Sequence, residues 1–396
     1  MRQKQALGVM MGGSNVFLTG APGAGKTYVL NKFIKRAERA GKRIAVTAST
    51  GIAASHLGGT TIHSWSGLGI LDELNANDLK KLSSSDKLIK RYNNTDVLVI
   101  DEVSMLHGKR LDMINTLAKK LRMSDKPFGG LQVILVGDLF QLPPISRGSS
   151  ELDFAHLSDA WTELDPKICY LTEQHRQTSG DNLLDLLTAM RVGKVEEIHE
   201  TYIKDRLEAE APESGSVTRL FSHNVDVDSI NKEHLDQMTK SVLAPEALEL
   251  KIGAEVMFVA NNFGAGYVNG SRGQVVDFVG GLPIVRLNNG REVKVDLNTW
   301  TLSEDGKVRA EISQLPLRLA WAITIHKSQG MSLDAAQIDL SRAFTPGMGY
   351  VALSRVRSLD GLYLQGINNM AMNLNPQIYV FDAHIQSASN DLAITV

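Results

Sequence analysis

Residues 20–27 read GAPGAGKT and match the pattern GxxxxGK[ST] of loops that bind nucleotide phosphates. Gly23 and Gly25 allow successive backbone N–H groups to turn toward phosphate oxygens. Lys26 can reach the β and γ phosphates, and the hydroxyl of Thr27 is suited to bind magnesium. This stretch therefore predicts a site for a nucleoside triphosphate.

The surroundings of the loop have the expected periodicity. The apolar run 15–19 precedes it and predicts a short buried strand, and from Lys26 to Gly41 apolar residues recur at helical spacing. A bound phosphate would then lie at a helix N-terminus, where unpaired N–H groups favour an anion. The alternative is a glycine-rich turn that matches by chance. The apolar positions of the predicted helix are Val29, Leu30, Phe33, Ile34 and Ala37.

Length and composition indicate a multidomain globular protein. The chain has 396 residues, of which 43% are hydrophobic and 22% charged, and domains of roughly 150 residues predict two or three of them. The formal net charge of -2 neither requires nor excludes nucleic acid, because a local basic channel can coexist with an acidic remainder.

Cysteine content and apolar runs bear on the compartment. Cys169 is the only cysteine, so an internal disulfide is excluded, and its apolar setting favours a core residue over a reactive thiol. No signal peptide opens the chain, and no apolar run reaches the roughly 18 residues of a membrane span. We expect a cytoplasmic protein, associated with the nucleoid if bacterial, without membrane contact.

Strand-like and helical runs alternate through the first half of the chain. Apolar strands at 97–102 (VLVIDE) and 133–138 (VILVGD) flank a helical pattern, which predicts an α/β unit with a parallel sheet. The polar, lysine-containing stretch 67–95 interrupts this order as a surface insert. The proline-rich stretch 141–150 marks the end of the unit.

A second α/β unit is predicted from ICYL at 168 onward, with further strands at 217, 336 and 361. Short strands with glycine turns at about 250–312 predict a small β-barrel inserted into that unit. The helical run from Asn182 to Arg191 belongs to the same unit.

Asp101 and Glu102 end one of the predicted strands, where parallel-sheet enzymes place reactive groups. Asp101 would hold magnesium through water, and Glu102 would orient or deprotonate an attacking water. The alternative is that both carboxylates cap a helix start at Ser104.

Three further side chains are candidates for the chemistry. Gln141, in GDLFQLPP at 137–144, can face the γ phosphate, although a purely structural turn is equally compatible. Arg176 and Arg355 lie in the second unit, and an arginine supplied across a cleft can neutralise charge on a transferring phosphoryl group. Alternatively, each is a surface residue or part of a salt bridge.

Two stretches, TIHSWSGL at 61–68 and TIHKSQG at 324–330, combine hydroxyls with a histidine. Hydroxyls and Lys327 suit phosphodiester contacts, and His63 or Trp65 could stack on a base. The alternative is that His63 and Trp65 pack in the core and that His326 caps a helix. Neither histidine is placed for a metal cluster.

Taken in order, these segments resemble the petite-integration-frequency (PIF) DNA helicases of superfamily 1B, related to the RecD and Dda helicases. The resemblance extends over nearly the whole chain, and the segment 109–130 (KRLDMINTLAKKLRMSDKPFGG) is similar to the stretch that sets this family apart. The matching motifs are Gln3 for the Q motif, 20–27 for I, TASTGIAA (47–54) for Ia, 61–68 for Ib, DEVSM (101–105) for II, 137–144 for III, LTEQHRQ (171–177) for IV, QLPLRLAWAITIHKSQGMSLD (314–334) for V and YVALSRVRS (350–358) for VI.

The resemblance implies roles for individual residues. Gln3 would read adenine, and Arg176 and Arg355 would complete the ATP site from the second domain. Motifs Ia, Ib and V would line a channel for single-stranded DNA. The implied nucleotide ligands are Gln3, Gly20, Gly23, Ala24, Gly25, Lys26, Thr27 and Gly330, the magnesium ligands Thr27 and Asp101, and the DNA contacts Thr50, His63, Trp65, Thr324, His326 and Lys327.

The resemblance also implies the architecture. Two RecA-like P-loop domains are expected, the first at 1–160 with a wedge insert at 67–95. The second would be formed by 161–250 together with 313–396, and the inserted barrel, called 2B in the family, by 251–312. The chain begins almost at the Q motif and ends about 40 residues after motif VI, so long flanking extensions are not expected.

The predicted function is an ATP- and magnesium-dependent helicase that moves 5′ to 3′ on single-stranded DNA and unwinds duplexes at single-strand/double-strand junctions. The polarity comes from the resemblance alone, as do roles in repair, recombination and telomere maintenance. We expect a monomer in the absence of DNA. The main alternative is a P-loop ATPase that remodels or loads partners without unwinding. A small-molecule kinase is a weaker alternative, because it would not need a second α/β unit.

Overall fold

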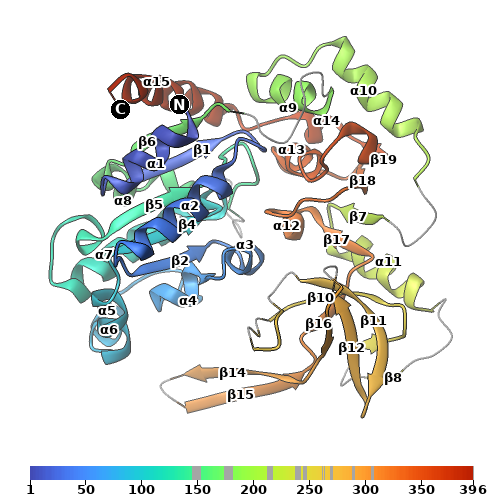
Figure 1. Ribbon diagram of the computed structural model, residues 1–396, viewed down its shortest axis with the longest axis horizontal. Coiled ribbons are helices and arrows are strands. Elements are labelled where there is room, and N and C mark those ends of the chain that lie inside the picture. Colours follow the sequence, from blue (N-terminus) through green and yellow to red (C-terminus); the bar gives the residue numbers. More distant parts are fainter. Residues whose placement is uncertain are drawn as a thin grey trace.

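The computed structural model describes most of the chain, and two α/β units lie side by side with a β domain beneath the second (Figure 1). The described residues are 1–144, 153–173, 182–211, 217–236, 242–243, 248–260, 262, 264–267, 271–287, 290–304 and 307–395.

The first unit is built on a parallel six-stranded sheet in the order β3-β2-β4-β5-β1-β6. Its central strands are apolar on both sides, because helices cover both faces. The bounds are β1 (Val16–Gly20), β2 (Ile44–Ala48), β3 (Thr60–Thr61), β4 (Val97–Asp101), β5 (Gln132–Val136) and β6 (Lys167–Leu171).

Alternate residues of the central strands enter two different cores. Phe17 packs with α7 (Gly108–Arg122) on one face, whereas Val16 and Leu18 pack with α1 (Gln3–Met11) and α2 (Lys26–Arg39) on the other. The predicted helix after the phosphate loop is confirmed, and its five predicted apolar positions are buried. The remaining helical segments of this unit are α3 (Gly51–His56), α4 (Ile62–Ser66), η1 (Val103–Met105), η2 (Pro127–Gly130), η3 (Ala155–Leu157) and α8 (Asp159–Leu164).

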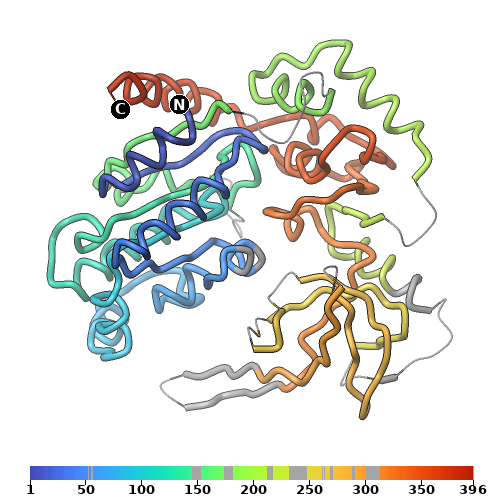
Figure 2. Tube along the Cα trace, in the orientation of Figure 1, coloured from blue at the N-terminus to red at the C-terminus, as the bar shows by residue number. Residues whose placement is uncertain are grey.

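The strand containing ICYL belongs to the first sheet, which corrects the expectation that it opens the second unit. β6 pairs in parallel with β1, with Leu18 opposite Cys169. The C-terminal helix α15 (Pro376–Thr395) returns to cover this strand, and the backbone N–H of Tyr170 donates to Ser389 Oγ at 2.9 Å. Both termini therefore lie at the same edge of the first unit (Figure 2). Alternation along a sequence predicts strands but does not state which sheet each strand joins.

The second unit has a parallel four-stranded sheet in the order β17-β7-β18-β19. Helices surround it, and α9 begins at Asn182, as predicted. The bounds are β7 (Thr218–Phe221), β17 (Ala322–Thr324), β18 (Ala336–Leu340), β19 (Leu362–Ile367), α9 (Asn182–Val192), α10 (Glu197–Glu208), α11 (Asn224–Asp236), α12 (Ile325–Ser328), α13 (Met348–Leu353), η5 (Leu359–Gly361) and α14 (Asn369–Met372).

The inserted β domain contains an antiparallel five-stranded sheet with its own apolar core around Val256, Phe258 and Val285. This sheet includes β16, which lies beyond the expected limit at 312. A separate hairpin, β14–β15, extends from the domain (Figure 1). The bounds are β8 (Val242–Leu243), β9 (Glu249–Leu250), β10 (Glu255–Phe258), β11 (Arg272–Val279), β12 (Leu282–Leu287), β13 (Glu292–Lys294), β14 (Asn298–Glu304), β15 (Lys307–Gln314) and β16 (Leu317–Leu319).

The polar insert of the first unit folds into two short helices, α5 (Ala76–Ser83) and α6 (Asp86–Asn93), that pack against α7. Their amphipathic pattern explains the packing, since Leu88 and Tyr92 are buried while the lysines face outward. Over the described ranges, none of the helices combines the length and the apolar character that crossing a membrane requires.

Candidate nucleotide site between the two units

The phosphate loop connects β1 to α2, as predicted. Gly20, Gly23 and Gly25 have φ angles of +144°, +86° and +86°, which side chains with a Cβ rarely adopt. A Cβ on Gly20 would also lie 2.7 Å from the carbonyl oxygen of Leu171. Glycines at these places let the backbone fold closely around the start of α2, where N–H groups face an anion.

Lys26 lies inside this loop. Its Nζ donates to the carbonyl oxygens of Gly20 at 2.6 Å and Ala21 at 3.1 Å. Burial lowers the pKa of Lys26, and the nearby carboxylate of Asp138 opposes that change. Thr27 is exposed in the first turn of α2, so its hydroxyl is accessible beside the loop.

Gln3 lies against the phosphate loop, although 21 residues separate it from Ala24. Its Nε2 donates to the carbonyl oxygen of Ala24 at 3.1 Å, and its backbone N–H donates to Glu173 Oε2 at 2.6 Å. Ala24 itself is buried in the core beneath the loop. The predicted nucleotide residues of the first unit are thus gathered at one place.

Asp101 ends β4 and Glu102 follows it, at the same edge of the sheet. Asp101 Oδ1 accepts from the backbone N–H of Glu102 at 2.8 Å. Glu102 has a left-handed backbone with φ +51° and precedes η1 without a side-chain capping bond, so helix capping does not explain its carboxylate. Burial raises the pKa of both carboxyls. The nearby carboxylate of Glu102 raises the pKa of Asp101 further. The positive charges of Arg355 and Lys26 oppose the rise in the pKa of Glu102.

Gln329 connects the two units and was not predicted as a site residue. The residue is only 1% exposed. Its Nε2 lies 3.4 Å from Glu102 Oε2, 3.3 Å from Ser104 Oγ and 3.2 Å from Gln141 Oε1. The predicted Gln141 is therefore held at the interface of the units. Gln329 directly precedes Gly330 within the predicted stretch 324–330, but nothing in the spacing distinguished it from its neighbours.

Gly330 and Arg355 were predicted to belong to this site, and the structure describes both of them in the second unit. A Cβ on Gly330 would lie 3.6 Å from Glu102 Oε1, so the glycine backbone faces the carboxylate. Arg355 is 5% exposed and donates to the carbonyl oxygens of Ser328 at 3.4 Å and Met331 at 3.1 Å. The surface alternative for Arg355 is therefore wrong. Arg176 lies outside the described residues.

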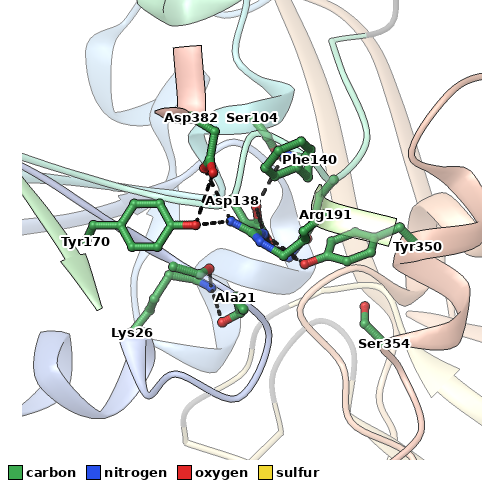
Figure 3. A network of polar contacts seen from close by, with 12 residues as sticks. Ala21, Lys26, Ser104, Asp138, Phe140, Tyr170, Arg191, Tyr350, Ser354 and Asp382 are labelled. Carbon is green, nitrogen blue, oxygen red and sulfur yellow. Dashed lines mark hydrogen bonds and ion pairs between the residues drawn. The ribbon is translucent and has the colours of Figure 1, made fainter. Parts of the chain in front are cut away.

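A buried polar network lies next to the phosphate loop and was not predicted (Figure 3). Arg191 Nη1 donates to both carboxylate oxygens of Asp138, at 2.7 and 2.8 Å, and to the hydroxyl of Tyr350 at 2.8 Å. Its Nη2 donates to the hydroxyl of Tyr170 at 2.7 Å and forms an ion pair with Asp382 at 3.4 Å. Sequence pattern gave no signal, because the five residues come from five separate segments.

Trp65 is placed in the core, which corrects its prediction as a base-stacking residue. It is 7% exposed, and its ring centroid lies 4.6 Å from that of Tyr92 on α6. The amphipathic turn of α4 directs Trp65 inward, while His63 remains partly exposed. Burial, Arg110 and His107 lower the pKa of His63, which favours its neutral form.

The other predicted DNA contacts lie at helix starts on the two units. Thr50 Oγ1 accepts from the backbone N–H of Ala53 at 3.2 Å, and Thr324 Oγ1 accepts from that of Lys327 at 3.4 Å. Thr324 is the N-cap residue of α12, and its buried hydroxyl is used by this hydrogen bond. The cap of α12 is therefore Thr324, whereas the alternative assigned it to His326.

His326 and Lys327 follow on α12 at the edge of the second unit. The His326 ring is 6.0 Å from that of Phe344, and the two are nearly parallel. Lys327 lines a cavity of about 480 Å³ with Arg318, between α11 and the β domain. Lys327 therefore places a cationic group at this cavity, whereas His326 places a partly buried aromatic ring beside Phe344.

Comparison with known proteins supports this arrangement. The family model described as PIF1-like helicase matches residues 4–201, and that of the DNA helicase Pif1 2B domain matches residues 233–278. The ATP-dependent DNA helicase Pif1 of Psychrobacter sp. (strain PRwf-1) is 40% identical over 476 residues, which cover 98% of this chain and 71% of the relative.

Solved structures agree along nearly the whole chain. The crystal structure of Pif1 helicase from Candida albicans has a TM-score of 0.87 at 34% identity and covers 97% of this chain and 98% of that one. The crystal structure of Bacteroides Pif1 bound to ssDNA has a TM-score of 0.83 at 31% identity, with 98% and 97% covered. The chain therefore belongs to the PIF1-like helicase family.

Proposed function

We propose that this protein is an ATP-dependent DNA helicase that translocates 5′ to 3′ on single-stranded DNA and unwinds duplexes at junctions. The observation that carries the proposal is the meeting of Glu102, beside the phosphate loop, with Gln329 and Gly330 of the second unit. A site shared by two units changes when they move relative to each other, as a motor requires. A switch that never unwinds is not favoured, since the relatives are named helicases.

In this proposal the first unit binds the triphosphate and the second completes the site. Lys26 and the loop N–H groups hold the phosphates, and Glu102 orients and deprotonates the attacking water. Arg355 places positive charge opposite Glu102, which supports a role in neutralising charge that develops during hydrolysis. We assign Arg176 the same kind of role, on the resemblance of its motif alone.

The oxygen donors at this edge suit magnesium. Mg²⁺ is commonly held by one or two carboxylates together with substrate phosphates. Two buried carboxyls with raised pKa values lie here, and a cation would stabilise their ionised forms. Among the residues that the structure describes, no larger cluster of His, Cys, Asp and Glu could hold a metal. Asp101 and Thr27 would hold the ion, which would supply charge neutralisation at the phosphates.

Single-stranded DNA would cross both units along Thr50, His63, His326 and Lys327. Such contacts to the backbone are largely independent of sequence and weaken at high salt. We infer that residues 67–95 form the strand-separating insert and that the two RecA-like domains and the 2B domain follow the units described above. The corrected first domain includes β6. We further propose a monomer before DNA binding, in the cytoplasm or on the nucleoid.

The test compares unwinding of 5′-tailed and 3′-tailed duplexes that carry the same base-paired sequence, with ATPase rates measured with and without single-stranded DNA. We expect ATP-dependent unwinding of the 5′-tailed substrate and a turnover that DNA stimulates. Unwinding of only the 3′-tailed substrate would reverse the polarity. DNA-independent ATPase activity without unwinding of either duplex would contradict the helicase proposal.

A further inference from the structure

The Arg191 cluster, defined as Asp138, Tyr170, Arg191, Tyr350 and Asp382, lies at the boundary of the two units (Figure 3). Asp138 follows β5, and Tyr170 lies in β6 of the first sheet. Arg191 and Tyr350 come from α9 and α13 of the second unit, and Asp382 comes from α15, which covers β6. The cluster therefore joins side chains that belong to different units.

The ion pair at the centre of the cluster is deeply buried. The side chains of Asp138 and Arg191 are 0% and 7% exposed. Removing two charges from water costs much of the energy that their attraction returns, so such a pair contributes little net stability. The pair instead fixes the relative positions of the surrounding side chains, because the planar guanidinium donates to several acceptors at fixed angles.

The cluster is connected to both sides of the nucleotide site. Asp138 acts electrostatically on Lys26, and the same loop carries Gln141. On the other side, the Tyr350 hydroxyl donates to Asp138 Oδ2 at 3.1 Å. Tyr350 lies on α13, and Arg355 Nε donates to Val351 O of that helix at 2.9 Å. Any shift of α13 at Tyr350 therefore moves Arg355 relative to Glu102.

We propose that Arg191 is a positioning residue for ATP hydrolysis: through Tyr350 it fixes α13, and with it Arg355, against the loop that follows β5. Arg191 acts through Arg355 and has no contact with the nucleotide in this assignment. The inference rests on the proposed function, since it deepens the account of the same site.

Two further contacts bear on the role of Arg191 and on its control. Its guanidinium carbon lies 4.5 Å from the ring centroid of Phe140, so the loop after β5 also covers its face. The Tyr379 hydroxyl donates to Met190 O at 2.8 Å, one residue away on α9. Tyr379 thus holds the same helix without joining the Arg191 cluster, which makes it a matched control.

The primary variant is Tyr350→Phe, because it keeps the buried ion pair and removes only the hydroxyl that links α13 to it. We expect the kcat of DNA-stimulated ATP turnover to fall about threefold to tenfold, which is the range that the net contribution of a typical hydrogen bond would give. The KM for ATP, the affinity for single-stranded DNA and the melting temperature should change little. Tyr379→Phe should leave kcat unchanged.

A double-mutant cycle separates positioning from mere structure. In an Arg355→Lys background, Tyr350→Phe should have almost no further effect on kcat, because the group on which it acts is already displaced. Arg191→Lys should reproduce the kcat loss of Tyr350→Phe if it folds, since Lys keeps the charge but not the planar fork. The Tyr350→Phe cycle tests the positioning role even if the Arg191→Lys protein does not fold.

An undiminished kcat in Tyr350→Phe would overturn the proposal, as would equal fractional losses in the two Arg355 backgrounds or a loss shared by Tyr379→Phe. Basal turnover of the unchanged protein is measured in the same assay. If DNA does not stimulate ATP turnover by the unchanged protein, the proposed function fails. The double-mutant cycle is then evaluated from the kcat measured without DNA.

Discussion

Glu102 combines a left-handed backbone with a carboxylate at the boundary of the units. Replacing Glu102 with Gln keeps its size and its contact with Gln329 but removes the carboxylate that we propose as the base. We expect kcat for ATP hydrolysis to fall about 10²-fold or more, whereas ATP binding persists. Steady-state turnover and binding of a fluorescent ATP analogue measure the two effects.

Glu163→Gln is the control for this variant, because Glu163 pairs with Lys119 on the surface, away from the site. Its turnover should equal that of the unchanged protein. Normal hydrolysis by the Glu102→Gln protein would remove Glu102 as the base.

His156 is a second residue whose environment makes a prediction. Its ring stacks on Phe381 with centroids 4.1 Å apart, and its Nδ1 has no hydrogen-bond partner among the described residues. Burial lowers the pKa of His156 to about 4. Between that value and the ordinary pKa near 6.5, the unfolded chain binds a proton that the folded protein excludes.

The stability that neutral His156 contributes is therefore complete above about pH 6.5 and is lost as the pH falls toward 4. We expect His156→Phe, which preserves the ring stacking, to lose less stability between pH 7 and pH 5 than the unchanged protein. The difference should be about 1–2 kcal/mol. Denaturant unfolding at both pH values measures it, and parallel losses in the two proteins would contradict the assignment.

At the scale of elements, α13 packs so closely on α14 that its glycine is required. A Cβ on Gly349 would lie 2.0 Å from the carbonyl oxygen of Ala371. Gly349→Ala should displace α13, destabilise the protein by about 1–3 kcal/mol and reduce ATP turnover because Arg355 follows that helix. Thermal unfolding and kcat measure the two effects.

Gly8, inside α1, is the matched control because nothing lies within 4 Å of its Cβ position. Gly8→Ala should leave turnover unchanged and stabilise the protein by about 0.5–1 kcal/mol. Equal stability changes at the two glycines would show that α13 and α14 are not rigidly packed.

At the scale of the whole molecule, the candidate nucleotide site lies between the two units and the proposed DNA path crosses both, so ligand binding should be coupled. If a non-hydrolysable ATP analogue changes the affinity for single-stranded DNA by some factor, DNA must change the affinity for the analogue by the same factor. Gln329→Ala removes a bridge between the units and should bring both factors closer to one by the same amount. Titrations of each ligand in the presence and absence of the other measure this.

Lys327→Ala is the comparison for that experiment. It should weaken DNA binding and reduce the salt dependence of DNA affinity while leaving the coupling factor unchanged. A Gln329→Ala protein with full coupling would show that the bridge does not transmit the nucleotide state.

Much of this protein was determined by the sequence alone. The phosphate loop, the helix after it, Asp101 and Glu102 were predictable because a loop, its glycines and a helix start are local features with fixed spacing. The α/β class followed from apolar periodicity for the same reason. The motifs in their order indicated the family.

Only the tertiary structure decided which segments meet. It placed ICYL in the first sheet, turned Trp65 into the core, and brought Gln329 to Glu102 across 227 residues of chain. It also assembled the Arg191 cluster from five segments. Such pairings depend on how sheets and helices pack in space, and a contact between distant segments leaves no periodic trace in either of them.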